Sequence, residues 1–454
     1  MTVRLLNDIE KEVTELLSKL ISLDTTNPPG NETVAAEYLA RVLEEDEFSC
    51  EVLEPATGRG SMITRLKGKD EAPSLLLLSH LDVVAADPKE WSVDPFSGVI
   101  KDGFVWGRGA LDMKFLTAIE VIVMKLLKRN NVKLKGDVIL AATADEEAGG
   151  RAGVHWLLHN HPEKIKTDYA INEGGGFGIP ISNKLLFTVQ NAEKGVVWLK
   201  IKARGRPGHG SIPSAADNAV LRMADVAHRL GTYRSKVHVT TTAKRFIEGL
   251  VRARKSVIPR QLLSSIMTNP LLADRILDRL AKKQPGMAEL IRAMLRTTIA
   301  PTILHGGVKT NVIPSNCEGT FDCRILPGQT KEMLLEEIKT VLQGIELEKL
   351  VFAFDKADKP SESPLDTPFY REIENVLKEF EPRCNVVPFM QTGGTDSRFL
   401  RAVGCVCYGF SPIKVDMPVD DFVKLAHGID ERISIENLVY GTSVLYTLIK
   451  RFMS

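Results

Sequence analysis

Apolar residues recur at helical spacing at the start of the chain. The segment MTVRLLNDIEKEVTELLSKLI interleaves leucines with acids and lysines, which predicts an amphipathic helix and argues against a signal peptide. Two prolines and a glycine between Thr25 and Glu32 are expected to end this helix and open a loop. A second helix is expected over residues 35–43.

The pattern then changes to short apolar or β-branched runs that end in polar residues or glycines. These runs are SMITRLKG, SLLLLSHLDVV, DVILAATADEE, DYAINEGG and, much later, CVCYGFS. With helical stretches between several of them, they predict an α/β fold whose mixed sheet has helices on both faces. In open sheets of this kind, ligands bind beyond the carboxyl ends of the strands. Four residues fall at such ends: His80, Glu146, Glu147 and Glu173.

From about residue 194 the pattern predicts a second, α+β domain inserted into the first. Its elements alternate in a β-α-β-β-α-β order: the strand VVWLKIKARG, a helix over 216–230, strands over 302–308 and 318–325, a helix over 331–342 and a strand near 350–354. A basic helical stretch over about 242–298 interrupts this order, and we interpret its leucines and methionines as packing residues. We therefore expect one domain over 1–193 and 357–454 and a second domain, over 194–356, inserted into it.

Composition agrees with this picture and narrows the partners. A chain of 454 residues is longer than one hydrophobic core commonly serves. Its formal net charge is only +1, so we expect no nucleic acid and no membrane as partners, and no run of about 18 apolar residues suggests a transmembrane segment. The basic run over 244–260 leaves nucleic-acid binding as a weaker alternative. Six scattered cysteines favour reduced thiols, and we expect a cytoplasmic protein.

Histidines and carboxylates recur at the predicted strand ends and in nearby loops. Each alone is typical of a turn or a solvated loop, but together they form a series: His80 and Asp82 in SHLDVV, Asp112 in GRGALDMK, Glu146 and Glu147 in ADEE, Glu173 in NEGG and His427 in LAHG. Imidazole nitrogens and carboxylate oxygens bind zinc, and two histidines with three carboxylates suffice for two ions if one carboxylate bridges them. Of two adjacent glutamates at a strand end, one can transfer protons while the other coordinates a metal ion, because their side chains diverge. The series predicts a two-metal hydrolytic site.

These motifs, together with RGRPGHGSIP, NVIP, DCRILPG and TGGTDSRF, occur in the order found in the M20 metallopeptidases, and the chain resembles that family over nearly its whole length. The resemblance implies two Zn²⁺ ions, or Co²⁺ or Mn²⁺ in their place. The implied ligands are His80 and Glu173 for one ion, Glu147 and His427 for the other, and Asp112 as the bridge. Glu146 is implied as the general base, and Asp82 as the acceptor of the second ring N–H of His80.

The resemblance also implies that residues 1–193 and 357–454 form the catalytic zinc-binding domain and that residues 194–356 form a lid or dimerisation domain. It assigns roles to residues of this inserted domain as well. His209, in RPGHGS, would stabilise the developing oxyanion. In many family members this histidine comes from a partner subunit, so we expect a homodimer, although the helical stretch over 242–298 puts the usual dimer surface in question. Asn311 and Arg324 match positions that grip a substrate carboxylate. From the residues alone, Asn311 could instead be a turn residue and Arg324 half of an interdomain salt bridge.

A glycine-containing loop completes the expected site. Gly393, Gly394 and Thr395 would form a backbone nest for the same carboxylate. Where many relatives have a serine before the acid, this chain has Thr395 followed directly by Asp396, so the role of Asp396 stays open.

The expected function is hydrolysis of an amide bond in a small carboxylate-bearing substrate, either a dipeptide or an N-acyl amino acid. Glu146 would take a proton from the attacking water and return it to the leaving amine. The sequence leaves a strict dipeptidase and an aminoacylase or desuccinylase both open, because both need a carboxylate grip and an amide between the metals. Similarity to larger carboxypeptidases and fatty N-acyl amino acid hydrolases adds bulky acyl or peptide substrates. The alternative from another class is a non-catalytic metal-binding relative.

Overall fold

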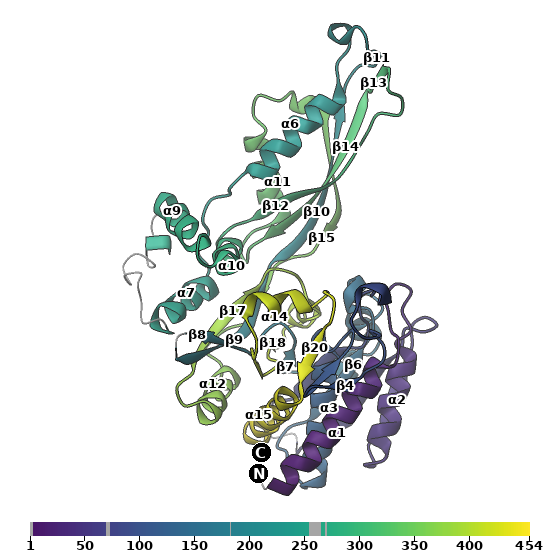
Figure 1. The fold of residues 1–454 in the computed structure, drawn as a ribbon, viewed down its shortest axis with the longest axis vertical. Coiled ribbons are helices and arrows are strands. Elements are labelled where there is room, and N and C mark those ends of the chain that lie inside the picture. Colours follow the sequence, from purple (N-terminus) through teal and green to yellow (C-terminus); the bar gives the residue numbers. More distant parts are fainter. Residues whose placement is uncertain (1–2, 70–72, 182, 254–264, 268–269) are drawn as a thin grey trace.

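The computed structural model describes residues 3–69, 73–181, 183–253, 265–267 and 270–454. A large mixed sheet and a smaller antiparallel sheet organise the chain (Figure 1). The main path of the 11-stranded sheet has the order β1 (Cys50–Leu53), β2 (Ser61–Leu66), β6 (Val138–Thr143), β3 (Leu75–His80), β7 (Tyr169–Asn172), β18 (Val406–Gly409), β9 (Lys184–Glu193), β8 (Phe177–Ile181) and β19 (Ile413–Lys414). Both β16 (Ser361–Glu362) and β17 (Asn385–Gln391) pair with β9 off this path.

Helices cover both faces of the large sheet. Leu75 and Leu77 of β3 belong to one core, and the alternate residues Leu76 and Leu78 belong to another. The first core includes residues of α1 (Val3–Ile21), α2 (Thr33–Glu44), α3 (Lys114–Arg129), α12 (Pro368–Phe380) and α15 (Ile435–Met453). The second includes residues of α4 (Val154–Asn160), α5 (Pro162–Ile165) and α13 (Ser397–Ala402). Burial on both faces explains the unbroken leucine run and confirms the predicted fold class.

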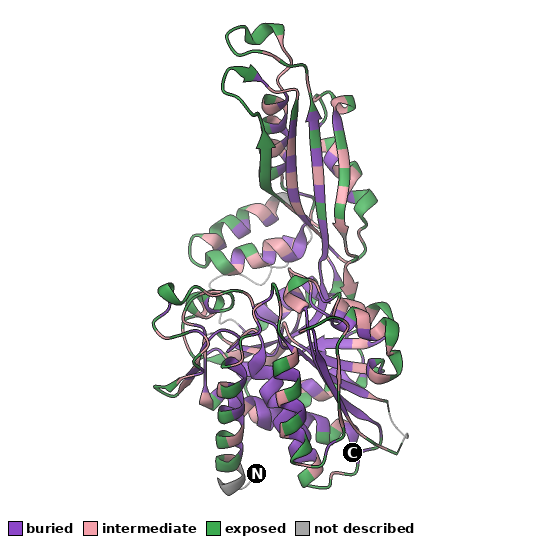
Figure 2. Ribbon diagram, turned by 90° about the vertical axis from the view of Figure 1, so that its right-hand side faces the viewer, coloured by how far each residue is buried: buried purple, intermediate pink, exposed green. Residues whose placement is uncertain are grey.

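The smaller sheet lies in the part of the chain predicted as an insertion. Its order is β12 (Thr298–Gly306), β14 (Asn316–Ile325), β10 (Gly195–Arg204) and β15 (Leu350–Ala357), with every pair antiparallel. Alternate residues of β10 and β14 are buried, as Figure 2 shows. Their buried side chains form a core with residues of α6 (Ala219–Thr232) and α11 (Lys331–Val341). One face therefore carries helices, as in the predicted β-α-β-β-α-β arrangement.

The predicted helical stretch packs on the large sheet. It contains α7 (Thr241–Ala253), α9 (Pro270–Ala281) and α10 (Pro285–Leu295), whose apolar residues share a core with β9 and β17. The rings of Phe246 and Phe389 lie 5.9 Å apart. A Cβ at Gly249 would come within 2.0 Å of Val387, so the absence of a side chain there lets α7 approach β17.

The crossing from the large sheet to the small one is a buried junction. Lys194 stands between β9 and β10. Its ammonium donates to the carbonyls of Ala293 and Arg296 and to the hydroxyl of Thr298. These bonds tie the end of α10 to the start of β10 and compensate the burial of the lysine.

Two further sheets are small. One contains β20 (Arg432–Ser434), β5 (Phe104–Trp106) and β4 (Ile100–Lys101). The other pairs β11 (Gly208–His209) with β13 (Val312–Ile313). It lies at the tip of the part that contains the small sheet, which we call the second unit, at the end farthest from the large sheet (Figure 1). None of the helices in the described ranges combines the length and apolar character needed to cross a membrane.

Candidate active site

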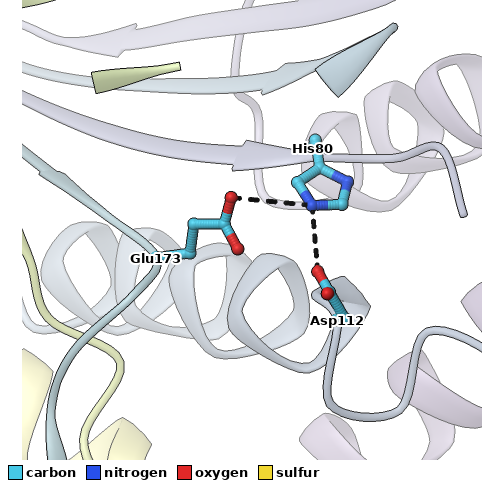
Figure 3. A group of neighbouring side chains, drawn as sticks. All are labelled: His80, Asp112 and Glu173. Carbon is cyan, nitrogen blue, oxygen red and sulfur yellow. Dashed lines mark hydrogen bonds and ion pairs between the residues drawn. The ribbon is translucent and has the colours of Figure 1, made fainter. Parts of the chain in front are cut away.

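Three side chains converge beyond the carboxyl ends of β3 and β7. His80 is the last residue of β3, Glu173 follows β7, and Asp112 lies in the loop before α3. The Nε2 atom of His80 is 3.2 Å from Oδ1 of Asp112 and 3.9 Å from Oε1 of Glu173 (Figure 3). Because β3 and β7 are parallel neighbours, their ends meet at one edge of the sheet. We call these residues the first group.

Asp112 also belongs to a second group, with Glu147 and His427. The Nε2 atom of His427 lies 3.1 Å from Oδ2 of Asp112 and 3.1 Å from Oε1 of Glu147. Glu147 follows β6, which is parallel to β3. Thus the two oxygens of Asp112 face different groups, and one ligand atom from each residue of a group lies within 4.8 Å of the others.

The donor atoms of both groups suit zinc. Each group offers one imidazole nitrogen and two carboxylate oxygens, if Asp112 serves both. Catalytic zinc sites use three protein ligands of these kinds and leave a position for water. The same donors also accept Co²⁺ or Mn²⁺, because geometry and availability select the ion.

The two groups concentrate negative charge. Burial raises the pKa of Glu173 to about 8, and the carboxylate of Asp112 adds to this shift. Burial would also raise the pKa of Asp112, but the imidazoles of His427 and His80 outweigh it and lower the pKa. The carboxylates of Asp112 and Glu147 raise the pKa of His427 to about 10. The carboxylates therefore favour positive charge between them, as a cation site requires.

Glu146 lies beside both groups. It shares a short 3₁₀ turn with Glu147 directly after β6. Burial, followed by the charge of Glu173, raises the pKa of Glu146 well above its ordinary value. A carboxyl group with a raised pKa can both accept and return a proton near neutral pH, as a general base must.

Asp82 positions the turn that carries the two glutamates. Its carboxylate accepts the backbone N–H groups of Glu146 and Glu147, each at 3.0 Å, and the amide of Asn27 at 2.8 Å. The Nδ1 atom of His80 lies 2.9 Å from the backbone carbonyl of Asp82 and 3.5 Å from its carboxylate. The carbonyl is therefore the nearer acceptor for the histidine, while the predicted acceptor, the carboxylate, mainly holds the neighbouring turn.

Sequence reasoning missed a second support of this turn. Asp145 has a φ of +75°, which residues other than glycine rarely adopt. Its carboxylate pairs with Arg59 and accepts the backbone N–H of Ala152 at 2.8 Å. Arg59 follows β1 in a loop far from any of the motifs. The position of Arg59 in the sequence therefore did not indicate that it contacts the turn of Glu146 and Glu147.

The loop over 393–395 is fixed from behind. Thr395 donates its backbone N–H to Oε2 of Glu193 at 2.5 Å, and Glu193 also pairs with Arg401. The N–H of Thr395 is therefore not free to bind a substrate carboxylate, as the predicted nest requires. The backbone N–H groups of Gly393 and Gly394 have no hydrogen-bond partner within the described part of the chain.

Asp396 is buried next to the groups. Neither of its carboxylate oxygens has a hydrogen-bond partner among the described residues. Burial raises its pKa to about 7. The positive charges of Arg398 and His80 lower this pKa, and the negative charge of Asp82 raises it. This residue thus belongs to the surroundings of the two groups.

The predicted substrate residues of the second unit lie at its two ends. Arg324, at the end of β14 next to β10, forms a fork with the carboxylate of Asp322 at 2.6 and 2.8 Å. His209 and Asn311 lie together at the far tip, where the N–H of Gly210 donates to the carbonyl of Asn311. At about 3.4 Å per residue, β14 separates the two ends by roughly 25 to 30 Å. Within one chain, Asn311 and His209 therefore do not join Arg324.

Comparison with known proteins identifies the family. The model of peptidase family M20/M25/M40 matches residues 76–451. The chain belongs to this family. The prediction of an M20 hydrolase of peptide or amide bonds is thereby confirmed.

Relatives of the M20 family match almost the whole chain. An N-fatty-acyl-amino acid synthase/hydrolase of Mus musculus is 26% identical over 96% of this chain and 87% of its own length. Aminoacylase-1B of Rattus norvegicus is 25% identical over 97% of this chain and 95% of its own. The crystal structure of an M20 family metallo-carboxypeptidase from Sulfolobus solfataricus has a TM-score of 0.72 at 18% identity, covering 97% of this chain and 99% of its own. This last similarity shows that the fold is shared.

Proposed function

We propose that the chain is a di-zinc hydrolase that cleaves the amide bond of a small carboxylate-bearing substrate. The substrate is either a dipeptide, from which the C-terminal residue is released, or an N-acyl amino acid. The observation that carries the proposal is the position of Asp112, with one oxygen in each of two groups of three ligands. Similar proteins named as an N-fatty-acyl-amino acid synthase/hydrolase and as an aminoacylase support this class of substrate.

Each ion would have its own ligands and share one. His80 and Glu173 would hold the first, Glu147 and His427 the second, and Asp112 both. Zinc ions in such a pair polarise a scissile carbonyl and lower the pKa of a water molecule. Glu146 accepts the proton of the attacking water and returns it to the leaving amine, which its raised pKa favours. Asp82 keeps Glu146 in place through the backbone.

The substrate carboxylate would be recognised at the junction of the two units. Arg324 presents a planar fork that suits a carboxylate, and Asp322 occupies this fork within the chain. The carboxylate of a substrate would therefore displace the carboxylate of Asp322 from the guanidinium of Arg324. The N–H groups of Gly393 and Gly394 would add to this grip, while Thr395 would keep its bond to Glu193.

A second copy of the chain would complete the site. The strand β12 forms an edge of the small sheet, and its Ile303 and Leu304 are 47% and 53% exposed. Exposed apolar edge strands favour pairing with another strand. The helices α7, α9 and α10 share their core with the large sheet, which leaves this edge uncovered. A homodimer through β12 would bring His209 and Asn311 to the partner's groups, where His209 would stabilise the oxyanion.

The proposal is tested on metal-reconstituted protein. The substrates are dipeptides and N-acetyl, N-succinyl and long-chain N-acyl amino acids. We expect Glu146→Ala to keep about two zinc ions per chain but to lose turnover by about 100-fold to 10,000-fold, the usual contribution of a general base. The exposed Glu163 serves as the matched control, and Glu163→Ala should hydrolyse at the wild-type rate. Unchanged turnover in Glu146→Ala contradicts the proposal, as does wild-type protein that hydrolyses no substrate of the panel.

A further inference from the structure

Glu431 holds the loop that ends in Asp112. Its carboxylate is fully buried. Oε1 accepts the backbone N–H groups of Leu111 at 2.6 Å and of Asp112 itself at 2.9 Å. Oε2 accepts the backbone N–H of Gly109 at 3.1 Å. A single carboxylate therefore satisfies three N–H groups of this loop and fixes the backbone from which the shared ligand projects.

Arg108 extends the same contact to the loop of His427. Its Nη1 donates to Oε2 of Glu431 at 2.7 Å. Its Nη2 donates to the carbonyl of Gly428 at 2.9 Å and to that of His427 at 3.4 Å. The guanidinium is buried and lies 5.2 Å from the centre of the Trp91 ring. Since His427 has a φ of +59°, which few side chains adopt, an external contact on its carbonyl helps to maintain this backbone.

The small sheet of β20 and β5 sets the position of this pair. Arg432 of β20 lies opposite Trp106 of β5. The next residue of the loop, Gly107, donates its N–H to the carbonyl of Glu431 at 2.9 Å. The register of the sheet thus places Glu431 alongside the start of the Asp112 loop, which explains how segments distant in sequence meet.

We infer that Arg108 and Glu431 are positioning residues that set Asp112 and His427 in register for the second metal ion. The inference rests on the proposed two-metal function. Glu431 bonds the backbone of Asp112, the ligand that both groups share, and Arg108 bonds the backbone carbonyl of His427, a ligand of the second group alone. His80 and Glu173 project from the ends of β3 and β7, and neither forms a hydrogen bond or ion pair with Arg108 or Glu431 in the described structure. Disturbing the pair should therefore weaken the second ion more than the first.

Two conservative variants separate the contacts. Arg108→Lys keeps a positive charge opposite Glu431 but loses the fork that also reaches the carbonyls of His427 and Gly428. Glu431→Gln keeps the shape of the side chain but replaces the carboxylate, which accepts three backbone N–H groups and one N–H of Arg108, by a neutral amide. Arg65→Lys is the control, since Arg65 likewise pairs with a carboxylate, Asp137, and donates to a backbone carbonyl, at 2.7 Å each.

The experiment titrates metal-depleted full-length protein with Zn²⁺ by calorimetry and with Co²⁺ by visible absorption. His427→Ala serves to assign the binding events, because the event that this variant loses is the one at the second group. In Arg108→Lys and Glu431→Gln we expect the dissociation constant of that event to rise by about 10-fold to 100-fold, the usual effect of removing an outer support of a metal ligand. The first event should change by less than about 3-fold in Arg108→Lys. In Glu431→Gln it should weaken too, but less than the second event, because Glu431 holds the backbone of Asp112, which also serves the first group. Arg65→Lys should match the wild type. Urea unfolding of the metal-depleted proteins checks that each variant is folded.

The outcomes distinguish the inference from the function on which it rests. Two binding events of wild-type strength in both variants overturn the positioning role and leave the proposed function intact. Equal weakening of both events in Arg108→Lys also overturns it, because Arg108 bonds the backbone of His427, a ligand of the second group alone. Wild-type protein that binds fewer than two ions overturns the two-metal site, and this inference with it.

Discussion

The Nε2 atom of His427 lies 3.1 Å from Oδ2 of Asp112. The other oxygen of Asp112 is 3.2 Å from the ring of His80. One carboxylate thus joins a histidine at the end of β3 to a histidine near the end of the chain. Substitutions at these three positions should accordingly have different effects on metal binding.

We expect Asp112→Ala to weaken both metal ions, whereas His80→Ala and His427→Ala should each weaken mainly one. The reason is that only Asp112 has an oxygen in each group. Metal content per chain after dialysis, measured by plasma mass spectrometry, provides the comparison. Retention of one tightly bound ion in Asp112→Ala would show that the carboxylate is not shared.

Glu120 should make stability depend on pH. It lies on α3 with both carboxyl oxygens buried. Burial raises its pKa well above the usual 4.5 and outweighs the nearby Ser79 hydroxyl, which lowers it. Above pH 4.5 the unfolded chain releases this proton while the folded chain keeps it, so the unfolded state binds fewer protons. The free energy of unfolding therefore falls with rising pH, by up to about 1.4 kcal/mol per pH unit.

Glu120→Gln removes this proton and keeps the shape of the neutral acid. The variant should gain stability relative to the wild type between about pH 5 and pH 8. Urea unfolding at several pH values measures the difference, and Glu10→Gln, at an exposed position of α1, is the control. A difference between Glu120→Gln and wild type that stays constant with pH would refute the neutral carboxyl.

The buried pair of Glu193 and Arg401 should support both the fold and the loop at Thr395. Glu193→Ala leaves the buried charge of Arg401 unpaired, which costs about 3 to 5 kcal/mol of unfolding free energy. It also frees the N–H of Thr395, so KM should rise more than kcat falls. Glu346→Ala breaks an exposed ion pair and should cost at most about 1 kcal/mol. Similar losses in both variants, or a KM equal to that of the wild type, would count against the role of Glu193.

Mixing two inactive variants tests whether His209 acts in a partner subunit. A heterodimer of Glu146→Ala and His209→Ala chains has one site with both residues intact if His209 acts in trans. Random mixing should then restore about a quarter of wild-type activity, since half of the dimers carry one complete site. Activity is assayed after the mixed chains have exchanged subunits, and sedimentation velocity verifies the dimers. No recovery from a confirmed heterodimer would place His209 in the site of its own chain.

The sequence alone predicted the elements and much of the site because those signals are local. The leucine run before His80 predicts a strand buried on both faces, and β3 has this environment. Alternation in VVWLKIKARG predicts a half-buried strand, which is β10. Strand-end placement likewise brought His80, Glu147 and Glu173 to one edge, because parallel strands align their ends.

Only the tertiary structure decided the contacts between distant segments. Nothing in the spacing of Arg108 and Glu431 indicates that they join two ligand loops, since the register of β20 on β5 brings them together. Equally, Asn311 and Arg324 flank a single strand pattern, yet the length of β14 holds them apart. Periodicity reports which face of an element is buried, whereas the pairing of elements arises from packing of the whole chain.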